Sequence, residues 1–124
     1  MCVVHQGFAP HPRQRWPFET NARSRAFVRP RQGDRYCAGG FQGGSSRRFI
    51  EAMKTMRDAI DEDAEHGITA RWHDESHWNR YLIDNPPDVV LPGDWMCSDE
   101  NQQPNQRLIA LTKDHEAMRC LKSA

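Results

Sequence analysis

The clearest periodic pattern of apolar residues lies in the middle of the chain. Apolar side chains recur there at spacings of four, three, four and four: Phe49, Met53, Met56, Ile60 and Ala64. Such spacings place side chains on one face of an α-helix. Ser45 or Ser46 can cap its N-terminus and Gly67 can end it. The pattern therefore predicts one amphipathic helix, whose acidic end over residues 61–67 is expected to face solvent.

A second helix is predicted over residues 75–84, with Asp74 as its N-cap and Pro86 and Pro87 after its end. Its aromatic and leucine residues, Trp78 among them, recur on one face and are expected in the core.

The remaining apolar runs are short. They predict strands at residues 35–39, 88–91 and 107–111, followed by a third helix over 113–122. Residues 1–34 are rich in proline, arginine and glycine, which predicts an irregular, extended segment. Short strands alternating with helices indicate the α/β class.

Length and charge narrow the possibilities. The 124 residues suit one domain, spanning the whole chain, and the net charge is zero. This balance argues against a dedicated nucleic-acid or membrane binder. Residues 1–48 hold nine arginines and two acidic residues, whereas residues 49–124 hold eight basic and fifteen acidic residues. We expect these oppositely charged halves to pair with each other.

The four cysteines are widely spaced and form no CxxC motif, which predicts free thiols rather than a disulfide framework or a zinc knuckle. No stretch has the pattern of a signal peptide or the length of a membrane span, so the sequence is expected to be a cytoplasmic protein or a fragment of something larger.

Four glycines, Gly39, Gly40, Gly43 and Gly44, fall within six positions. Glycines let a backbone approach a ligand closely. The stretch fits neither a P-loop nor the GxGxxG motif. On glycine content alone, it favours a tightly turning connection between a strand and a helix.

The stretch "WHDESHW" gathers titratable groups between two tryptophans. His73 and His77 are four residues apart, so both would share a helix face, as in a zinc site, but no third ligand is evident. Asp74 and Glu75 would point in different directions and serve different roles. The plainer alternative is a capping Asp74 followed by a first-turn Glu75.

Near the C-terminus, Lys113 and Arg119 could hold a diphosphate or could belong to a solvated helix.

Together the motifs resemble glycosyltransferase family 6. They occur in the order "F-E-x-x-x-x-S-x-A-F", "GDRYCAGGFQGGS", "WHDESHWNRYLI" and "KDHEAMR", and the resemblance runs from about His5 to Arg119. This family includes the ABO blood-group transferases and the α-1,3-galactosyltransferases, and the spacing is most similar to its bacterial and phage members. The resemblance implies the C-terminal, acceptor-side half of a GT-A-type fold. It also implies transfer of N-acetylgalactosamine or galactose from a UDP-sugar to the 3-OH of a galactoside, with retention of the α configuration.

The resemblance also implies roles for particular residues. The catalytic glutamate of the family corresponds to Glu75. Asp74 and His73 correspond to residues that bind the donor sugar, and Trp72 and His5 to residues that bind the acceptor.

Ala38, Gly39 and Gly40 correspond to the triplet that sets donor choice, and glycine at position 40 implies N-acetylgalactosamine. Lys113 and Arg119 correspond to basic residues that close over the diphosphate.

The uridine-binding strands and the Asp-x-Asp motif of the family, Asn-x-Asn in bacterial members, precede the region of resemblance. No metal ligand is therefore predicted within residues 1–124, although Mn²⁺ could serve the full family enzyme. A preceding half or a partner chain is expected to be needed. Two alternatives remain open: a non-catalytic carbohydrate-binding module that uses Trp72 and His5, and a small metal-binding domain that uses His73 and His77.

Overall fold

A computed structural model describes residues 1–102, 104 and 106–114. Within them lie two α-helices and five short strands: β1 (Cys2–Val4), β2 (Cys37–Gln42), α1 (Ser46–Glu65), α2 (His73–Asp84), β3 (Val90–Leu91), β4 (Met96–Ser98) and β5 (Leu108–Ala110). The fold is therefore mixed α/β, as predicted. Neither of these helices is long and apolar enough to cross a membrane.

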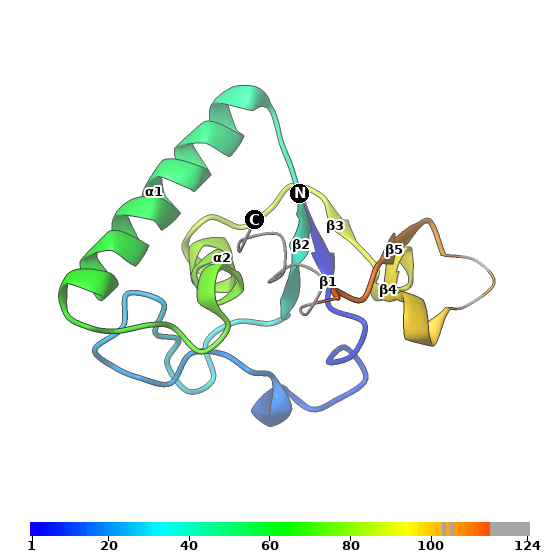
Figure 1. The fold of residues 1–124 in the computed structure, drawn as a ribbon, viewed down its shortest axis with the longest axis horizontal. Coiled ribbons are helices and arrows are strands. Elements are labelled where there is room, and N and C mark those ends of the chain that lie inside the picture. The colour runs from blue at the N-terminus through cyan, green and yellow to red at the C-terminus, as the bar shows by residue number, and fades with distance from the viewer. Residues whose placement is uncertain (103, 105, 115–124) are drawn as a thin grey trace, which may run out of the picture.

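The strands form two small sheets. β1 is the middle strand of the order β2-β1-β3, antiparallel to β2 and parallel to β3. β4 and β5 form a separate parallel pair. In Figure 1, α2 stands between α1 and β2, and the β4–β5 pair lies beyond β3. Helix α2 thus contacts both the sheet and α1.

Helix α1 confirms the periodic pattern for most of its length. It begins after Ser45, whose side chain makes no capping hydrogen bond. Ala52 and Met56 are buried against Trp78 of α2, in the cluster that includes the cysteines of β1 and β2. Ala64 is exposed, so the apolar face ends before the helix does.

Helix α2 begins two residues earlier than predicted. Trp72 is at its N-cap, so the predicted cap by Asp74 is wrong. The Trp72 N–H instead donates to the hydroxyl of Ser76 at 3.0 Å. Asp74 and Glu75 both lie in the first turn, where negative charge is favoured by the helix dipole.

One buried side chain fixes α2 against β2. The Oδ1 of Asn79 accepts from the N–H of Cys37, and its Nδ2 donates to the carbonyl of Cys37, both at 2.8 Å. Its Nδ2 also donates to the carbonyl of Glu75 at 3.0 Å. The amide therefore binds the edge of β2 as a neighbouring strand would.

The prediction of an irregular segment over residues 1–34 is wrong at its start, because Cys2–Val4 form the central strand β1. A run of three residues is too short to show a period. Most of the remainder is irregular, and it packs through an aromatic cluster centred on Phe18, Val28 and Tyr36.

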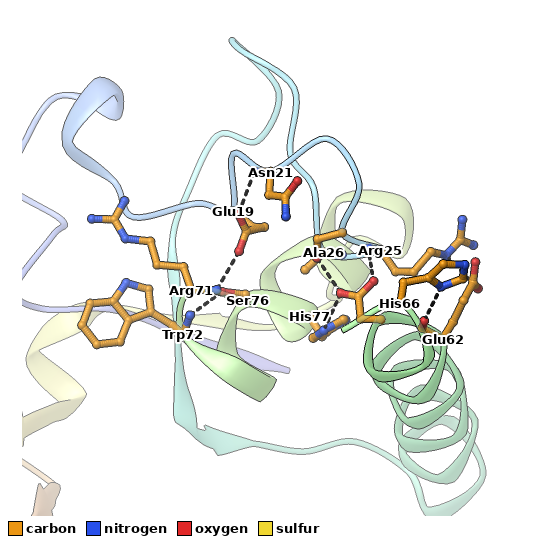
Figure 2. A network of polar contacts seen from close by, with 12 residues as sticks. Glu19, Asn21, Arg25, Ala26, Glu62, His66, Arg71, Trp72, Ser76 and His77 are labelled. Carbon is orange, nitrogen blue, oxygen red and sulfur yellow. Dashed lines mark hydrogen bonds and ion pairs between the residues drawn. The ribbon is translucent and has the colours of Figure 1, made fainter. Parts of the chain in front are cut away.

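The acidic end of α1 is only partly solvated. Asp63 is buried, because its carboxylate accepts from the Ser24 hydroxyl at 2.6 Å and from the Arg25 N–H at 2.7 Å. His77 Nε2 lies 3.5 Å from the same carboxylate. Figure 2 shows Arg25 and His77 meeting at this point from the loop and from α2. The two halves therefore meet at Asp63 through a hydroxyl and a backbone N–H rather than through opposite charges. Opposite charges do pair nearby, in the half-exposed Arg25–Glu62 ion pair.

The other predicted elements shift by a few residues. The strand predicted at 35–39 forms as β2 and extends into the glycine stretch, and those predicted at 88–91 and 107–111 form as β3 and β5. β4 was not predicted. Of the third predicted helix, only Lys113 and Asp114 are described, and they are not helical; the rest lies outside the described residues.

We expect the free energy of unfolding to fall as the pH drops below about 6.5. Burial lowers the pKa of His77, which outweighs the opposing effect of the Asp63, Glu19 and Asp74 charges. A histidine with a lowered pKa binds its proton more readily in the unfolded chain. Its contribution is therefore complete above the unfolded-state pKa and is lost as the pH falls toward the folded-state pKa. Urea denaturation at about pH 7.5 and about pH 5.5 should show that the free energy of unfolding changes less with pH in His77→Gln than in the wild type.

The matched control is His66→Gln, which alters an exposed histidine at the end of α1. That variant should keep the wild-type pH dependence. An unchanged slope in His77→Gln would show that another group controls the acid sensitivity.

Candidate active site

The carboxylate of Glu75 is held between two donors. The Tyr36 hydroxyl donates to its Oε1 and the N–H of Gly39 donates to its Oε2, both at 2.8 Å. Tyr36 directly precedes β2 and Gly39 lies within it, whereas Glu75 lies in the first turn of α2. The side chain is half-buried. It faces the glycine strand in a single, defined orientation.

Tyr36 is suited to remain a donor. Burial, and then the negative charge of Glu75, raise the pKa of its hydroxyl well above the usual range. The phenol therefore keeps its proton at physiological pH and donates a hydrogen bond to the carboxylate.

Helix geometry explains why Glu75 reaches β2. A glutamate at the third position of a helix often turns back to bind the N-cap N–H. Here Ser76 accepts from the N–H of Trp72, so Glu75 is free to point elsewhere. Asn79 lies four residues later on the same face and binds Cys37. Both side chains therefore reach the same strand, two residues apart.

Gly39 and Gly40 differ in what surrounds them. A Cβ built at Gly39 would lie 2.9 Å from the Cβ and 3.2 Å from the Cα of Glu75. A Cβ built at Gly40 would meet only the Cε of Met96, at 3.0 Å. At Gly39 the added Cβ would meet the Cα and Cβ of Glu75, which move only with the helix. At Gly40 it would meet the end of the flexible Met96 side chain. Only glycine at position 39 allows α2 this close.

A buried carboxylate shapes the turn before α2. Glu19 accepts from the N–H of Arg71 at 2.6 Å and from that of Asn21 at 2.7 Å (Figure 2). His73 has a φ of 46°, in the left-handed region that side chains seldom occupy. The indole of Trp72 points away from this network and is 48% exposed.

His5 lies on the same side of the sheet edge as Tyr36. Its ring centroid is 6.1 Å from that of Tyr36 and 4.7 Å from that of Phe8. Its Nδ1 accepts from the N–H of Gly7 at 3.2 Å. This leaves Nε2 as the nitrogen available to another partner.

The structure thus brings together several residues that were predicted to bind substrates. Glu75 contacts the triplet Ala38–Gly40 through Gly39, and His5 joins the group through Tyr36. Asp74 and His73 are exposed beside Glu75 in the first turn of α2. Their roles stay predictions.

Of the other two predicted donor-binding residues, the structure describes only one, and it is not part of this group. Lys113 is exposed after β5 and forms no hydrogen bond or ion pair with the other described residues. Arg119 lies outside the described residues.

The two histidines of the metal hypothesis have different surroundings. His77 is buried beside Asp63, whereas His73 is exposed. Across residues 1–102, 104 and 106–114, no group of three or more histidine, cysteine, aspartate or glutamate residues could hold a metal ion. Those residues do not fit a metal site.

Sequence reasoning missed the side chains that hold Glu75 and its helix: Tyr36, Asn79 and Glu19. A usable signal existed for Asn79, because a polar residue next to Trp78 on the buried face of a helix needs a partner. Glu19 and Tyr36 carried no local signal, since their partners lie 52 and 39 residues away.

This arrangement holds a carboxylate in place beside β2, whose Gly40 is exposed, and the exposed Trp72 is at the N-cap of the same helix. The sequence model of glycosyltransferase family 6 matches residues 1–120. The chain belongs to this family. That finding confirms the resemblance drawn from the motifs.

Relatives carry the same family's activities in their names. Human globoside α-1,3-N-acetylgalactosaminyltransferase 1 is 35% identical over 124 residues, covering 99% of this chain and 36% of that protein. Rat histo-blood group ABO system transferase 1 is 35% identical over 122 residues, covering 94% of this chain and 35% of that protein. Human α-1,3-galactosyltransferase 2 is 35% identical over 82 residues, covering 66% of this chain and 24% of that protein. The chain therefore spans about a third of the length of the first two of these family 6 relatives.

We expect Gly39→Ala to lower the free energy of unfolding by about 1–3 kcal/mol, because the added methyl group pushes α2 away from β2. Gly44→Ala is the control, since a Cβ there would meet no atom within 4 Å. It should change stability by less than about 0.5 kcal/mol. Urea denaturation measures both. Equal stability of the two variants would contradict the close contact between Gly39 and Glu75.

Proposed function

We propose that this family 6 chain forms the sugar-transfer part of a retaining hexosyltransferase with a GT-A-type fold. It moves N-acetylgalactosamine or galactose from a UDP-sugar to the 3-OH of a galactoside in α linkage. The observation that carries the proposal is the Glu75 carboxylate, fixed by Tyr36 and Gly39 beside the glycine strand β2. The names of the relatives support the α-1,3 linkage and both donor sugars.

Glu75 supplies a negative charge next to the anomeric carbon of the donor sugar. A retaining transfer needs a carboxylate near the anomeric carbon, either to attack it or to stabilise the positive charge that develops there. Among the described residues, no arginine or lysine forms an ion pair with Glu75. Its two hydrogen bonds fix the position of the carboxylate while leaving its negative charge available to the sugar.

The acceptor binds at Trp72 and His5. An exposed indole face suits the apolar C–H side of a galactose ring. The Nε2 of His5, on the same side as Tyr36, is available to a sugar hydroxyl.

The donor sugar lies along Ala38–Gly40, with Asp74 and His73 binding its hydroxyl groups. Lys113 and Arg119 offset the charge that builds on the departing diphosphate. We place the uridine site, and any Mn²⁺, in the part of the family fold outside residues 1–124, as the third of the relatives' length covered by this chain suggests.

We expect Glu75→Gln to reduce transfer at least about 100-fold, because the neutral amide cannot stabilise positive charge at the anomeric carbon. The measurement is release of UDP and formation of the disaccharide product, in a protein that contains this chain. Binding of UDP, followed by isothermal titration, should be unchanged.

Glu65→Gln is the control, since it neutralises an exposed glutamate at the far end of α1. That variant should keep full activity. Full activity in Glu75→Gln would reject the assigned role. A wild-type protein that binds a fucosylated galactoside but no UDP-sugar would favour the carbohydrate-binding alternative.

We expect Gly40→Ala to shift the donor preference from UDP-N-acetylgalactosamine toward UDP-galactose by about tenfold or more, because a methyl group there occupies room for the N-acetyl group. Met96 can move its terminal methyl group to accommodate the change, so the fold should persist. The ratio of kcat/KM for the two donors measures the shift, with Gly44→Ala as the control. An unchanged ratio would show that the N-acetyl group does not lie at Gly40.

A further inference from the structure

Two buried cysteines, distant in sequence, meet between neighbouring strands. The thiol of Cys37 in β2 donates to the Sγ of Cys2 in β1 at 2.8 Å, and both residues are fully buried. We propose that Cys2 and Cys37 form a redox pair, which a peroxide oxidises to a disulfide. The proposal is independent of the sugar-transfer chemistry.

The strand pairing holds these sulfur atoms in place. Cys37 pairs with Val4 of β1, and an irregularity in the register lies between Val4 and Cys2. The N–H of Cys2 donates to the carbonyl of Val89 on the other side of the strand. Because a disulfide bond is about 2.05 Å long, the two sulfurs need to approach by less than about 1 Å.

The surrounding charges distinguish the two thiols. The hydrogen bond from Cys37, helped by the charge of Arg35, lowers the pKa of Cys2 despite its burial. The same hydrogen bond, with burial, raises the pKa of Cys37. Cys2 is therefore the sulfur that forms a thiolate and attacks first, because the thiolate is the reactive form.

The reaction balances with one peroxide. The Cys2 thiolate attacks one peroxide oxygen, the O–O bond breaks, and a sulfenic acid and one water form after uptake of a proton. The sulfur of Cys37 then attacks the sulfur of Cys2. The S–S bond forms, the S–O bond breaks, and the leaving hydroxide takes the thiol proton of Cys37 to become a second water. Two electrons pass from the two sulfurs to the peroxide.

A small oxidant suits the position of the pair. Cys37 borders a cavity of about 370 Å³, whose wall also includes Arg31, Arg35, Pro86 and Pro87. Cys2 does not line this cavity, but its sulfur lies 2.8 Å from that of Cys37. Hydrogen peroxide is little larger than water, so a brief opening beside Cys37 would admit it to Cys2 and would exclude a bulky disulfide reagent.

The bond would link β1 covalently to β2, next to Ala38 and Gly39. It would close a loop from residue 2 to residue 37, which restricts the unfolded chain. We expect oxidation to raise the thermal midpoint by several degrees, reversibly with dithiothreitol.

The test uses a Cys97→Ser/Cys120→Ser variant, in which only the proposed pair remains. Treatment with hydrogen peroxide should abolish both titratable thiols and lower the protein mass by about two units. Trypsin digestion without reductant should then yield residues 1–13 joined to residues 36–47. The same treatment of Cys37→Ser should give no cross-link within the chain.

A kinetic comparison shows whether the fold aligns the sulfurs. The cross-link should form at least about tenfold faster in the folded variant than in about 8 M urea, because the native strands hold the thiols together. Three results would overturn the proposal: two thiols that stay free in the folded protein, irreversible oxidation of Cys2 without a cross-link, or equal rates in the folded and unfolded states.

Discussion

Strand β2 lies at the edge of its sheet, and the amide of Asn79 binds the N–H and carbonyl of Cys37 that a further strand would otherwise bind. Because both ends of the amide are used, the contact fixes how far α2 lies along β2 and how it is rotated. Glu75 lies one turn before Asn79 and therefore meets Gly39, two residues after Cys37. Loss of the Asn79 side chain would leave the N–H and the carbonyl of Cys37 buried without hydrogen-bond partners.

A second buried group fixes the other end of the same arrangement. Glu19 lies 52 residues from Arg71 and accepts its N–H, so the irregular N-terminal segment sets the turn that leads into α2. Asp63 likewise holds the N-terminal segment against α1, because it accepts from the Ser24 hydroxyl and the Arg25 N–H. Buried carboxylates therefore connect this segment to the helices, together with the apolar cluster of Phe18 and Val28, against which Ile83 of α2 packs.

The sequence predicted the elements that are long enough to show a period. Both helices were found, since apolar residues over three or more turns carry a strong signal. β3 and β5 are equally short but were predicted from their apolar runs, whereas β1 and β4 were missed. Three residues show no alternation, and β1 forms through pairing with segments far along the chain. The N-cap of α2 was misplaced because Asp74 is a good capping residue, whereas the hydroxyl of Ser76, the fourth residue of the helix, accepts from the N–H of Trp72 at the actual N-cap.

For the site, the resemblance supplied the residues predicted to face the substrates but not the side chains behind them. Glu75 was predicted, whereas Tyr36 and Asn79 were not, because their importance depends on which segments meet in space. Local pattern cannot supply such pairings. The four cysteines illustrate the same limit: their spacing indicated no partnership, and yet two of them are in contact.

The unequal surroundings of Gly39 and Gly40 also bear on how this strand can diverge over generations. Any replacement at position 39 must displace helix backbone, so selection for a folded chain removes it before activity matters. A replacement at position 40 has only the tip of Met96 to move. Of these two glycines, Gly40 is therefore the one that can be replaced while the fold is kept.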